Sequence, residues 1–335
     1  MRFLIATGIY PPEIGGPAIY ARELSEALRT KGHVVEVGTF GSLKKLPTGL
    51  RHFFLFFRLA RFVQRADIVI ALDTFSAALP AFFASKMFGK PFVMRTGGDF
   101  IWEQYVERTA DLLPLPFFYE KHGPFTLKER IYMRVTKLIL RHAWLVFSST
   151  FQKNIWMHPY GISEAKTLVI ENAVEGTLPA QHPARKNFLW FSRDLKLKNG
   201  AKLKEAFVIA KKWVPELELE TGHVSYESMI EKIQSCYAVI LPSISDITPN
   251  YILDALRCGK PFILTKYSEY AKTYGDRGLL VDPLNVEDIA EKIAALCSEE
   301  TYKELAGRIA ERPITRTYSD LADDFVALAS KILRV

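Results

Sequence analysis

The sequence predicts an α/β protein with two doubly wound parallel-sheet domains, over residues 1–173 and 174–317. Strand-like and helix-like patterns alternate through the first of these ranges, and a second alternation runs through the other. Between them, residues 175–186 contain two prolines and favour a linker over a regular element. The last helical pattern, over about 318–335, predicts a helix that packs back on the first domain. At 335 residues, the chain has the length expected of two domains.

In the first half, the predicted strands are short apolar runs and the predicted helices are longer periodic segments. Strands are expected at 2–8, 34–40, 67–73, 91–97, 144–149 and 167–174, and helices at 17–31, 49–67, 75–88 and 128–142. Residues 111–125 are rich in proline and aromatic residues and lack periodicity. They are expected to form a loop, either with a binding role or as an ordered connection.

The second half repeats this pattern after the linker. Strands are expected at 187–193, 217–222, 237–242, 261–265 and 279–283, and helices at about 201–213, 226–235, 286–296 and 300–310. A further helix is expected between the third and fourth of these strands, in the sequence SISDITPNYILDALRCGKP. Because the strands alternate with helices, they are expected to run parallel.

Two aspartates eight positions apart flank the start of that further helix. Thr248 is expected to cap a helix whose first position is Pro249, and Gly259 to take the left-handed conformation that ends it. Asp246 then lies in the preceding loop, and Asp254 lies on the second turn, on a different face from the apolar side chains. Asp254 is therefore expected to avoid the core. Each aspartate alone could be a turn residue or a solvated one, but open α/β sheets bind ligands at this edge, which makes both binding candidates.

Composition indicates a globular protein, with 49% hydrophobic and 24% charged residues and no low-complexity tract. Its three cysteines are far apart and lie in apolar or helical contexts, so neither a disulfide framework nor a zinc site is expected: Cys236, Cys258 and Cys297. The start of the chain lacks the pattern of a signal peptide, and the apolar stretches are too short to span a bilayer. We expect a cytoplasmic protein.

The net charge of +7 is concentrated in the first half. Residues 1–170 hold 22 Lys and Arg against 13 Asp and Glu, whereas residues 171–335 hold 22 against 24. Two predicted helices carry much of this charge, interleaved with phenylalanine in the first of them: Arg51, Arg58, Arg61 and Arg65, and Arg134, Lys137 and Arg141. An anionic membrane surface favours such helices, although ordinary solvated surface helices have the same pattern. No nucleic-acid-binding motif accompanies the charge, so no nucleic-acid partner is expected.

Two further loops follow predicted strands and precede predicted helices. In residues 10–20, Gly15 and Gly16 remove side chains where a ligand could approach the backbone. This loop is not GxGxxG, and no acidic residue ends the next strand, which argues against a dinucleotide site. In residues 190–203, Arg193 and Lys198 suit a diphosphate, with a solvated basic turn as the alternative.

Taken together, these motifs resemble the retaining glycosyltransferases of the GT4 type, which have the GT-B fold. The resemblance rests on their order along the chain: PPEIGG, IENAVE, R-x4-K followed by NG, LPS ahead of acid-x7-acid, and ALRCGKPFI. It covers nearly the full length. It implies two Rossmann-like domains facing across a cleft, with the acceptor bound by residues 1–173 and the nucleotide-sugar donor by residues 174–317.

The resemblance also implies a role for each candidate residue. Arg193 and Lys198 would bind the donor diphosphate, with Gly15 and Gly16 facing it. Asp246 would orient the donor sugar, and Asp254 would accept hydrogen bonds from the ribose. The N-terminus of the helix expected in SISDITPNYILDALRCGKP would be offered to phosphate by Thr248, Pro249 and Asn250. Enzymes of this fold generally need no cofactor or bound metal, so none is expected.

Two positions depart from the family pattern. The family usually has Glu-x7-Glu, whereas this chain has Asp246 and Asp254, whose side chains are shorter by about 1.5 Å, one C–C bond. Gly97 stands nearest to the position of a common family histidine, and Asp99 is the candidate to take over part of its catalytic role.

The predicted function is therefore a retaining hexosyltransferase that uses a nucleotide-diphosphate sugar. Its predicted acceptor is lipid-linked or a cell-envelope glycan at the cytoplasmic face of the membrane, because the first half is basic. Two alternatives keep the fold and change the reaction: a sugar nucleotide epimerase and a phosphorylase. A third is a catalytically degenerate subunit that binds sugar nucleotide or glycan without turnover.

Overall fold

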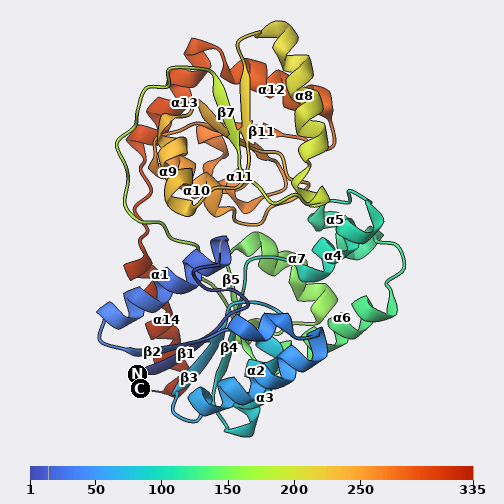
Figure 1. Cartoon of the computed structure of the whole chain (residues 1–335), viewed down its shortest axis with the longest axis vertical. Helices are drawn as coiled ribbons and strands as arrows, with labels where there is room; N and C mark the ends of the chain where they lie inside the picture. Colours follow the sequence, from blue (N-terminus) through green and yellow to red (C-terminus); the bar gives the residue numbers. More distant parts are fainter. Residues whose placement is uncertain (14, 335) are drawn as a thin grey trace. The chain divides into compact units, whose positions relative to one another are not determined.

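The computed structural model describes residues 1–13 and 15–334, and it divides into two compact units (Figure 1). Unit 1 comprises Met1–Ile101, Pro124–Ala173 and Thr317–Val335, and unit 2 comprises Trp102–Gly123 and Val174–Arg316. Each unit contains one parallel sheet with helices on both faces. The predicted fold class, two parallel α/β sheets, is confirmed.

The sheet of unit 1 has six parallel strands in the order β2-β1-β3-β4-β5-β6. Their bounds are β1 (Arg2–Ala6), β2 (Val34–Gly38), β3 (Ile68–Ala71), β4 (Phe92–Thr96), β5 (Trp144–Phe147) and β6 (Thr167–Val169). The β3 and β4 residues are buried throughout, as expected for strands covered on both faces.

Helices cover both faces of this sheet. They are α1 (Gly16–Thr30), α2 (Thr48–Val63), α3 (Ala78–Met87), α6 (Leu127–Leu140), α7 (Thr150–Tyr160) and α14 (Tyr318–Leu333), with 3-10 turns η1 (Gly41–Lys45) and η2 (Glu164–Lys166). The C-terminal helix α14 packs against α1, and Phe325 of α14 joins the core formed by Leu24 of α1 and Phe3 of β1. Helices α2 and α3 pack against each other on the other side of the sheet (Figure 1).

The sheet of unit 2 has five parallel strands in the order β11-β10-β9-β7-β8. Their bounds are β7 (Asn187–Trp190), β8 (Glu218–Thr221), β9 (Ala238–Leu241), β10 (Phe262–Thr265) and β11 (Gly278–Val281). Alternate side chains point to opposite faces: Phe188 packs with α8 and α12, and Leu189 packs with α9 and α10.

The helices of unit 2 include two that come from the first half of the sequence. They are α4 (Phe100–Thr109), most of which lies in unit 2, and α5 (Leu115–Lys121), followed by α8 (Gly200–Trp213), α9 (Tyr226–Ser235), α10 (Asn250–Arg257), α11 (Glu269–Tyr274), α12 (Val286–Leu296) and α13 (Glu299–Glu311). The 3-10 turns are η3 (Lys196–Lys198) and η4 (Gly275–Arg277).

The sequence predicts a boundary at residue 173, but residues 102–123 cluster with unit 2. The expected loop at 111–125 also contains the helix α5. Helices α4, α7 and α11 were not predicted either, because they are short or carry a weak apolar period. In the part of the chain that the structure describes, no helix is both long and apolar enough to cross a bilayer.

Candidate active site

Two loops of unit 2 carry the candidate donor residues. The first follows β7 and contains Arg193 and Lys198, and the second follows β9 and contains Asp246. Because β7 and β9 are neighbouring parallel strands, both loops leave the same edge of the sheet. The sequence positions of these residues after strands are therefore sufficient to bring them to one edge.

Buried Asn199 holds these loops together. Its backbone is left-handed, with φ of 62°, and its Nδ2 donates to the carbonyl oxygens of Pro242 at 3.0 Å and Pro283 at 2.7 Å. The backbone N–H of Ile244 also donates to the carbonyl of Leu197 at 2.9 Å. Asparagine tolerates the left-handed region and has two donors, which explains how one side chain links three loops.

Lys198 and Asp246 form an ion pair at this edge. The distance from Lys198 Nζ to Asp246 Oδ2 is 2.6 Å, and the side chains are 16% and 18% exposed. Ser243 Oγ lies 3.5 Å from the same carboxylate oxygen, and the Asp246 N–H donates to the carbonyl of Tyr267 at 3.2 Å. A charge-assisted hydrogen bond in such a partly desolvated place is stronger than a neutral one. The structure thus brings together two predicted donor residues that lie 48 positions apart in the sequence.

Arg193 lies in the same loop but is exposed. Among the described residues, its guanidinium makes no hydrogen bond or ion pair within the unit. Lys198 is already paired with a carboxylate, whereas Arg193 is available to an anionic ligand. The two cations that the sequence grouped as a diphosphate pair therefore differ in their surroundings.

Helix α10 begins one residue later than predicted. Pro249 is the N-cap, with extended backbone and no side-chain capping bond, and Asn250 is the first helical residue. The prediction that Thr248 caps a helix starting at Pro249 was wrong in this detail, because the proline itself ends the extended loop. Thr248 is buried and Asn250 is partly exposed. Gly259 has φ of 70°, which is the predicted left-handed conformation.

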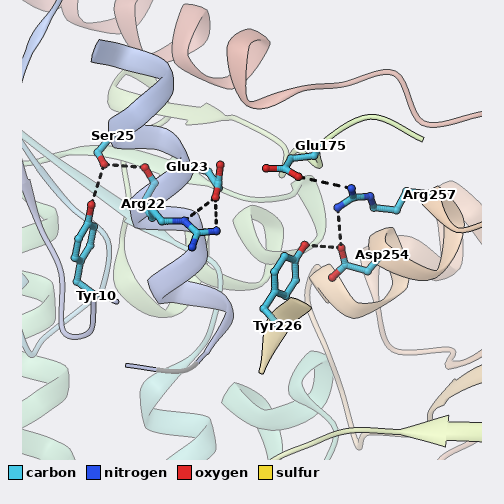
Figure 2. A network of polar contacts seen from close by, with 8 residues as sticks. All are labelled: Tyr10, Arg22, Glu23, Ser25, Glu175, Tyr226, Asp254 and Arg257. Atoms are coloured by element: carbon cyan, nitrogen blue, oxygen red, sulfur yellow. Dashed lines mark hydrogen bonds and ion pairs between the residues drawn. The ribbon is translucent and has the colours of Figure 1, made fainter. Parts of the chain in front are cut away.

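Asp254 is buried rather than turned away from the core. It is 2% exposed, and its Oδ1 accepts a hydrogen bond from the Tyr226 hydroxyl at 2.8 Å and lies 3.8 Å from an Arg257 nitrogen (Figure 2). The expectation failed because α9, which carries Tyr226, covers the face that the helical wheel left free. Burial raises the pKa of Asp254 to about 6, although Tyr226 and Arg257 both oppose that shift.

The linker packs on this helix, which the sequence did not predict. Arg257 Nε donates to the carbonyl of Gly176 at 3.2 Å, and an Arg257 nitrogen lies 3.7 Å from Glu175 (Figure 2). Buried Lys260 donates to the carbonyl of Gln181 at 2.6 Å, and the Leu178 N–H donates to the carbonyl of Arg257 at 2.7 Å. The linker residues 175–186 therefore satisfy the buried cations at the end of α10.

Residues 102–123 contact both donor loops. Glu107 of α4 accepts the Leu197 N–H through Oε1 at 3.1 Å, and its carbonyl accepts Lys196 Nζ at 2.8 Å. The Leu115 N–H donates to Ser245 Oγ at 3.0 Å. The loop that carries Lys198 is thus held from the other side by a segment 90 positions away in sequence. No local pattern could have indicated this contact.

The glycine loop of unit 1 precedes α1. Gly15 is the N-cap, with φ of 149°, and Gly16 is the first residue of the helix. A side chain at Gly15 would be strained at that φ, which is consistent with the predicted close approach of a ligand to the backbone.

Asp99 of unit 1 is buried and does not lie open to solvent. It is 1% exposed, and its Oδ2 accepts a hydrogen bond from Trp156 Nε1 at 2.8 Å. At Gly97, an added Cβ would lie 2.9 Å from the Arg95 guanidinium, which stacks on the Tyr20 ring at 4.1 Å. A larger residue at Gly97 thus requires Arg95 to move, which is a physical reason for glycine where the family commonly has histidine.

The basic residues of α2 and α6 have different environments. Arg61, Arg65, Arg134 and Arg141 are exposed, and Lys137 is partly exposed. Arg58 instead donates from Nη1 to the carbonyls of Thr39 and Phe40, both at 3.0 Å, so it ties α2 to the end of β2. Only part of the predicted basic surface is therefore available to a partner.

Comparison with known proteins assigns a family to a segment of the chain that carries candidate donor residues. Residues 184–299 match the family model described as glycosyl transferases group 1. This part of the chain is a group 1 glycosyltransferase domain. It contains Arg193, Lys198, Asp246 and Asp254, so the predicted resemblance is confirmed for the region that carries them.

One curated relative matches a similar length of the chain. Over 123 residues, it is 24% identical to the N,N'-diacetylbacillosaminyl-diphospho-undecaprenol alpha-1,3-N-acetylgalactosaminyltransferase of Campylobacter jejuni. The match spans 35% of this chain and 33% of that relative.

Solved structures match the whole chain. HepE of Anabaena, in complex with UDP-glucose, has a TM-score of 0.70 at 15% identity and covers 99% of this chain and 100% of its own. WaaG, a glycosyltransferase involved in lipopolysaccharide biosynthesis, has a TM-score of 0.66 at 14% identity and covers 99% of each chain. These likenesses show that the chain has the GT-B fold, as predicted.

Proposed function

We propose that the chain is a retaining glycosyltransferase that transfers a sugar from a nucleotide-diphosphate sugar to a lipid-linked or cell-envelope glycan acceptor. The observation that carries this proposal is the Lys198–Asp246 ion pair at the carboxyl edge of adjacent strands, within the group 1 domain. At this edge the cation suits the diphosphate of a sugar nucleotide, and the adjacent carboxylate suits the hydroxyls of its sugar.

Lys198 and Arg193 neutralise the diphosphate, both in the bound donor and as it leaves. Arg193 offers a planar fork of donors, and Lys198 a point charge. The start of α10 adds backbone N–H groups and the positive end of a helix dipole at Asn250. Stabilising the charge that develops on the leaving group lowers the barrier to transfer. HepE was solved with UDP and with UDP-glucose, so UDP is the first donor base to test.

Asp246 orients the hydroxyls of the donor sugar, and its pairing with Lys198 fixes the direction of its carboxylate. Asp254 binds the ribose. Both contacts given for Asp254 involve Oδ1, so a ribose hydroxyl is proposed to reach Oδ2. Asp99 contributes by holding Trp156 and the end of β4 in position.

Unit 1 binds the acceptor, and its exposed arginines Arg61, Arg65, Arg134 and Arg141 lie against an anionic membrane surface at the cytoplasmic face. The name of the Campylobacter relative describes an undecaprenol-diphosphate-linked acceptor, which supports a lipid-linked acceptor here.

The test is a thermal-shift screen of the full chain against UDP, GDP, ADP and their common sugar conjugates. A bound nucleotide stabilises the native state by mass action, so one nucleotide raises the midpoint of the wild type and much less that of Arg193→Gln/Lys198→Met. Lys211→Gln/Lys212→Gln on α8 is the matched control, because both lysines are exposed and lie in the same unit. No shift with any nucleotide would overturn the proposal.

A second assay separates the alternatives by the products formed with the bound sugar nucleotide. Transfer releases nucleoside diphosphate only when an acceptor is present. Epimerisation changes the sugar without that requirement, and a degenerate binding subunit gives a thermal shift but no product under either condition.

A further inference from the structure

An aromatic groove lies between α2 and α3 of unit 1. It encloses about 470 Å³ and is lined by Phe53, Phe56 and Phe57 of α2 and by Phe83 and Met87 of α3. Four of these side chains are about half exposed or more, from 48% for Phe83 to 63% for Met87. Such a cluster of exposed large apolar side chains is unusual on a protein surface and marks a binding site.

The groove is not required by the core of unit 1. Helix α2 buries Leu55, Leu59 and Val63, none of which lines the groove, whereas Phe53 and Phe57 are exposed. The Phe53 and Phe57 rings pack edge to face with centroids 4.9 Å apart, so the groove has preformed walls. The exposed side chains that line it are therefore not part of the buried core.

A second cavity, of about 350 Å³, lies at the carboxyl ends of β1 and β3. It is lined by Gly8 and Asp73, which follow those strands, and by Lys44 and Arg51. Arg51 lines this polar cavity, and the next residue, His52, lines the aromatic groove. The first turn of α2 thus borders both the polar cavity and the apolar groove.

Arg51 is the unsatisfied cation of the polar cavity. Its Nε is buried and has no hydrogen-bond partner, and in the described part of the chain its guanidinium forms no ion pair. Lys44, by contrast, is paired with Glu13. Asp73 accepts the N–H groups of Phe75, Ala77 and Ala78, and burial raises its pKa, so its negative charge is weakened. A buried donor without a partner is costly unless a ligand satisfies it.

We infer that these two cavities bind one amphipathic lipid, with its hydrocarbon chain in the α2–α3 groove and its phosphate at Arg51. The charge of Arg51 complements an anionic head, and the aromatic lining complements a prenyl or acyl chain. This inference rests on the proposed function and narrows its acceptor class to lipid phosphates or diphosphates. It assigns Arg51 to the head group and Phe57 and Phe83 to the chain.

The experiment measures binding of farnesyl diphosphate to the full chain by calorimetry, below the concentration at which the probe forms micelles. Phe57→Gln and Phe83→Gln each weaken binding by about tenfold, because each loses the burial of a phenyl ring against the chain. Phe54→Gln is the matched control, since Phe54 is an exposed phenylalanine of α2 outside the groove, and it changes binding less than about twofold. Arg51→Gln removes the preference for farnesyl diphosphate over farnesol.

Other outcomes overturn the inference. The inference is wrong if farnesyl diphosphate does not bind to the wild type. It is also wrong if Phe54→Gln loses as much affinity for farnesyl diphosphate as the two groove variants do. Another such outcome is loss of binding to anionic vesicles in the groove variants with unchanged farnesyl diphosphate binding, because the groove is then a membrane contact only. The nucleotide-induced thermal shift is measured in the same variants. It stays at the wild-type value whether or not the lipid binds, so failure here is distinguishable from failure of the proposed function.

Discussion

The ammonium group of Lys198 lies 2.6 Å from the carboxylate of Asp246, across two loops that leave neighbouring strands. This pair gives each residue a defined direction before any donor binds. When the diphosphate arrives, Lys198 can contact phosphate while it still faces Asp246. The two side chains are therefore expected to act as one unit.

Lys198→Met is expected to weaken nucleoside diphosphate binding by about tenfold to a hundredfold, the value of one or two charge-assisted hydrogen bonds. Asp246→Asn is expected to lower kcat for transfer more than it raises the dissociation constant for the nucleotide, because Asp246 is proposed to face the sugar rather than the nucleotide. In the double variant, the two effects on binding are expected to be less than additive. Calorimetric titration of the four proteins measures this coupling, and strict additivity would contradict it.

Donor binding is expected to depend on pH through Asp254, whose pKa is raised to about 6 by burial. Below that pH the carboxyl is protonated and no longer an anionic acceptor for the ribose, so nucleotide affinity falls by about tenfold between pH 7 and pH 5. Asp254→Asn is expected to bind weakly and without this dependence. Nucleotide affinity is measured for the wild type and for Asp254→Asn at each pH. Protonation of the nucleotide phosphates changes both affinities equally, so the difference between the two proteins reports Asp254 alone.

The same pKa has a consequence for stability, with an unusual sign. In the unfolded chain Asp254 ionises near 3.8, whereas in the folded chain it keeps its proton up to about pH 6. The folded state binds more protons in this window, so the free energy of unfolding decreases by about 2 kcal/mol as pH rises from 4 to 6, from this group alone. Urea titrations of the wild type and Asp254→Asn measure the difference. A variant with the same pH slope as the wild type would contradict the assignment.

Glu107 is expected to position the loop that carries Lys198, although it lies in a segment from the first half of the sequence. Glu107→Ala removes the acceptor for the Leu197 N–H and is expected to weaken nucleotide binding by about tenfold. It is also expected to speed hydrogen exchange at Leu197, which a general loss of stability would not confine to that loop. Glu120→Gln, an exposed glutamate of the same segment, is the control and leaves both unchanged.

Arg61→Gln/Arg65→Gln is expected to weaken binding to anionic vesicles by about 2 kcal/mol at physiological salt, roughly 1 kcal/mol for each exposed arginine. Raising the salt concentration should reduce the difference, because the attraction is screened. Lys211→Gln/Lys212→Gln in unit 2 is the control. Vesicle co-sedimentation measures all three proteins, and equal losses in both double variants would argue against a directed membrane face.

Local patterns were sufficient to predict the two sheets, most of the helices and the donor candidates. Lys198 and Asp246 could be predicted because each follows a strand, and neighbouring parallel strands bring their ends to one edge. Asp254 was assigned to the right helix but to the wrong environment, since the wheel cannot tell which element covers a face. The helices α4 and α5 were missed because their segment is short and has little apolar period.

The order of strands, helices and charged loops along the chain specified the fold class and the group of candidate donor residues, because hydrophobic period and position after a strand are properties of neighbouring residues. Folding brought together what lies far apart in sequence: Tyr226 with Asp254, Glu107 with the Lys198 loop, and the phenylalanines of α2 with Phe83 of α3. Burial and the partners of a charged group depend on such packing. The raised pKa of Asp254 and the open aromatic groove therefore follow from the tertiary structure and from no local pattern.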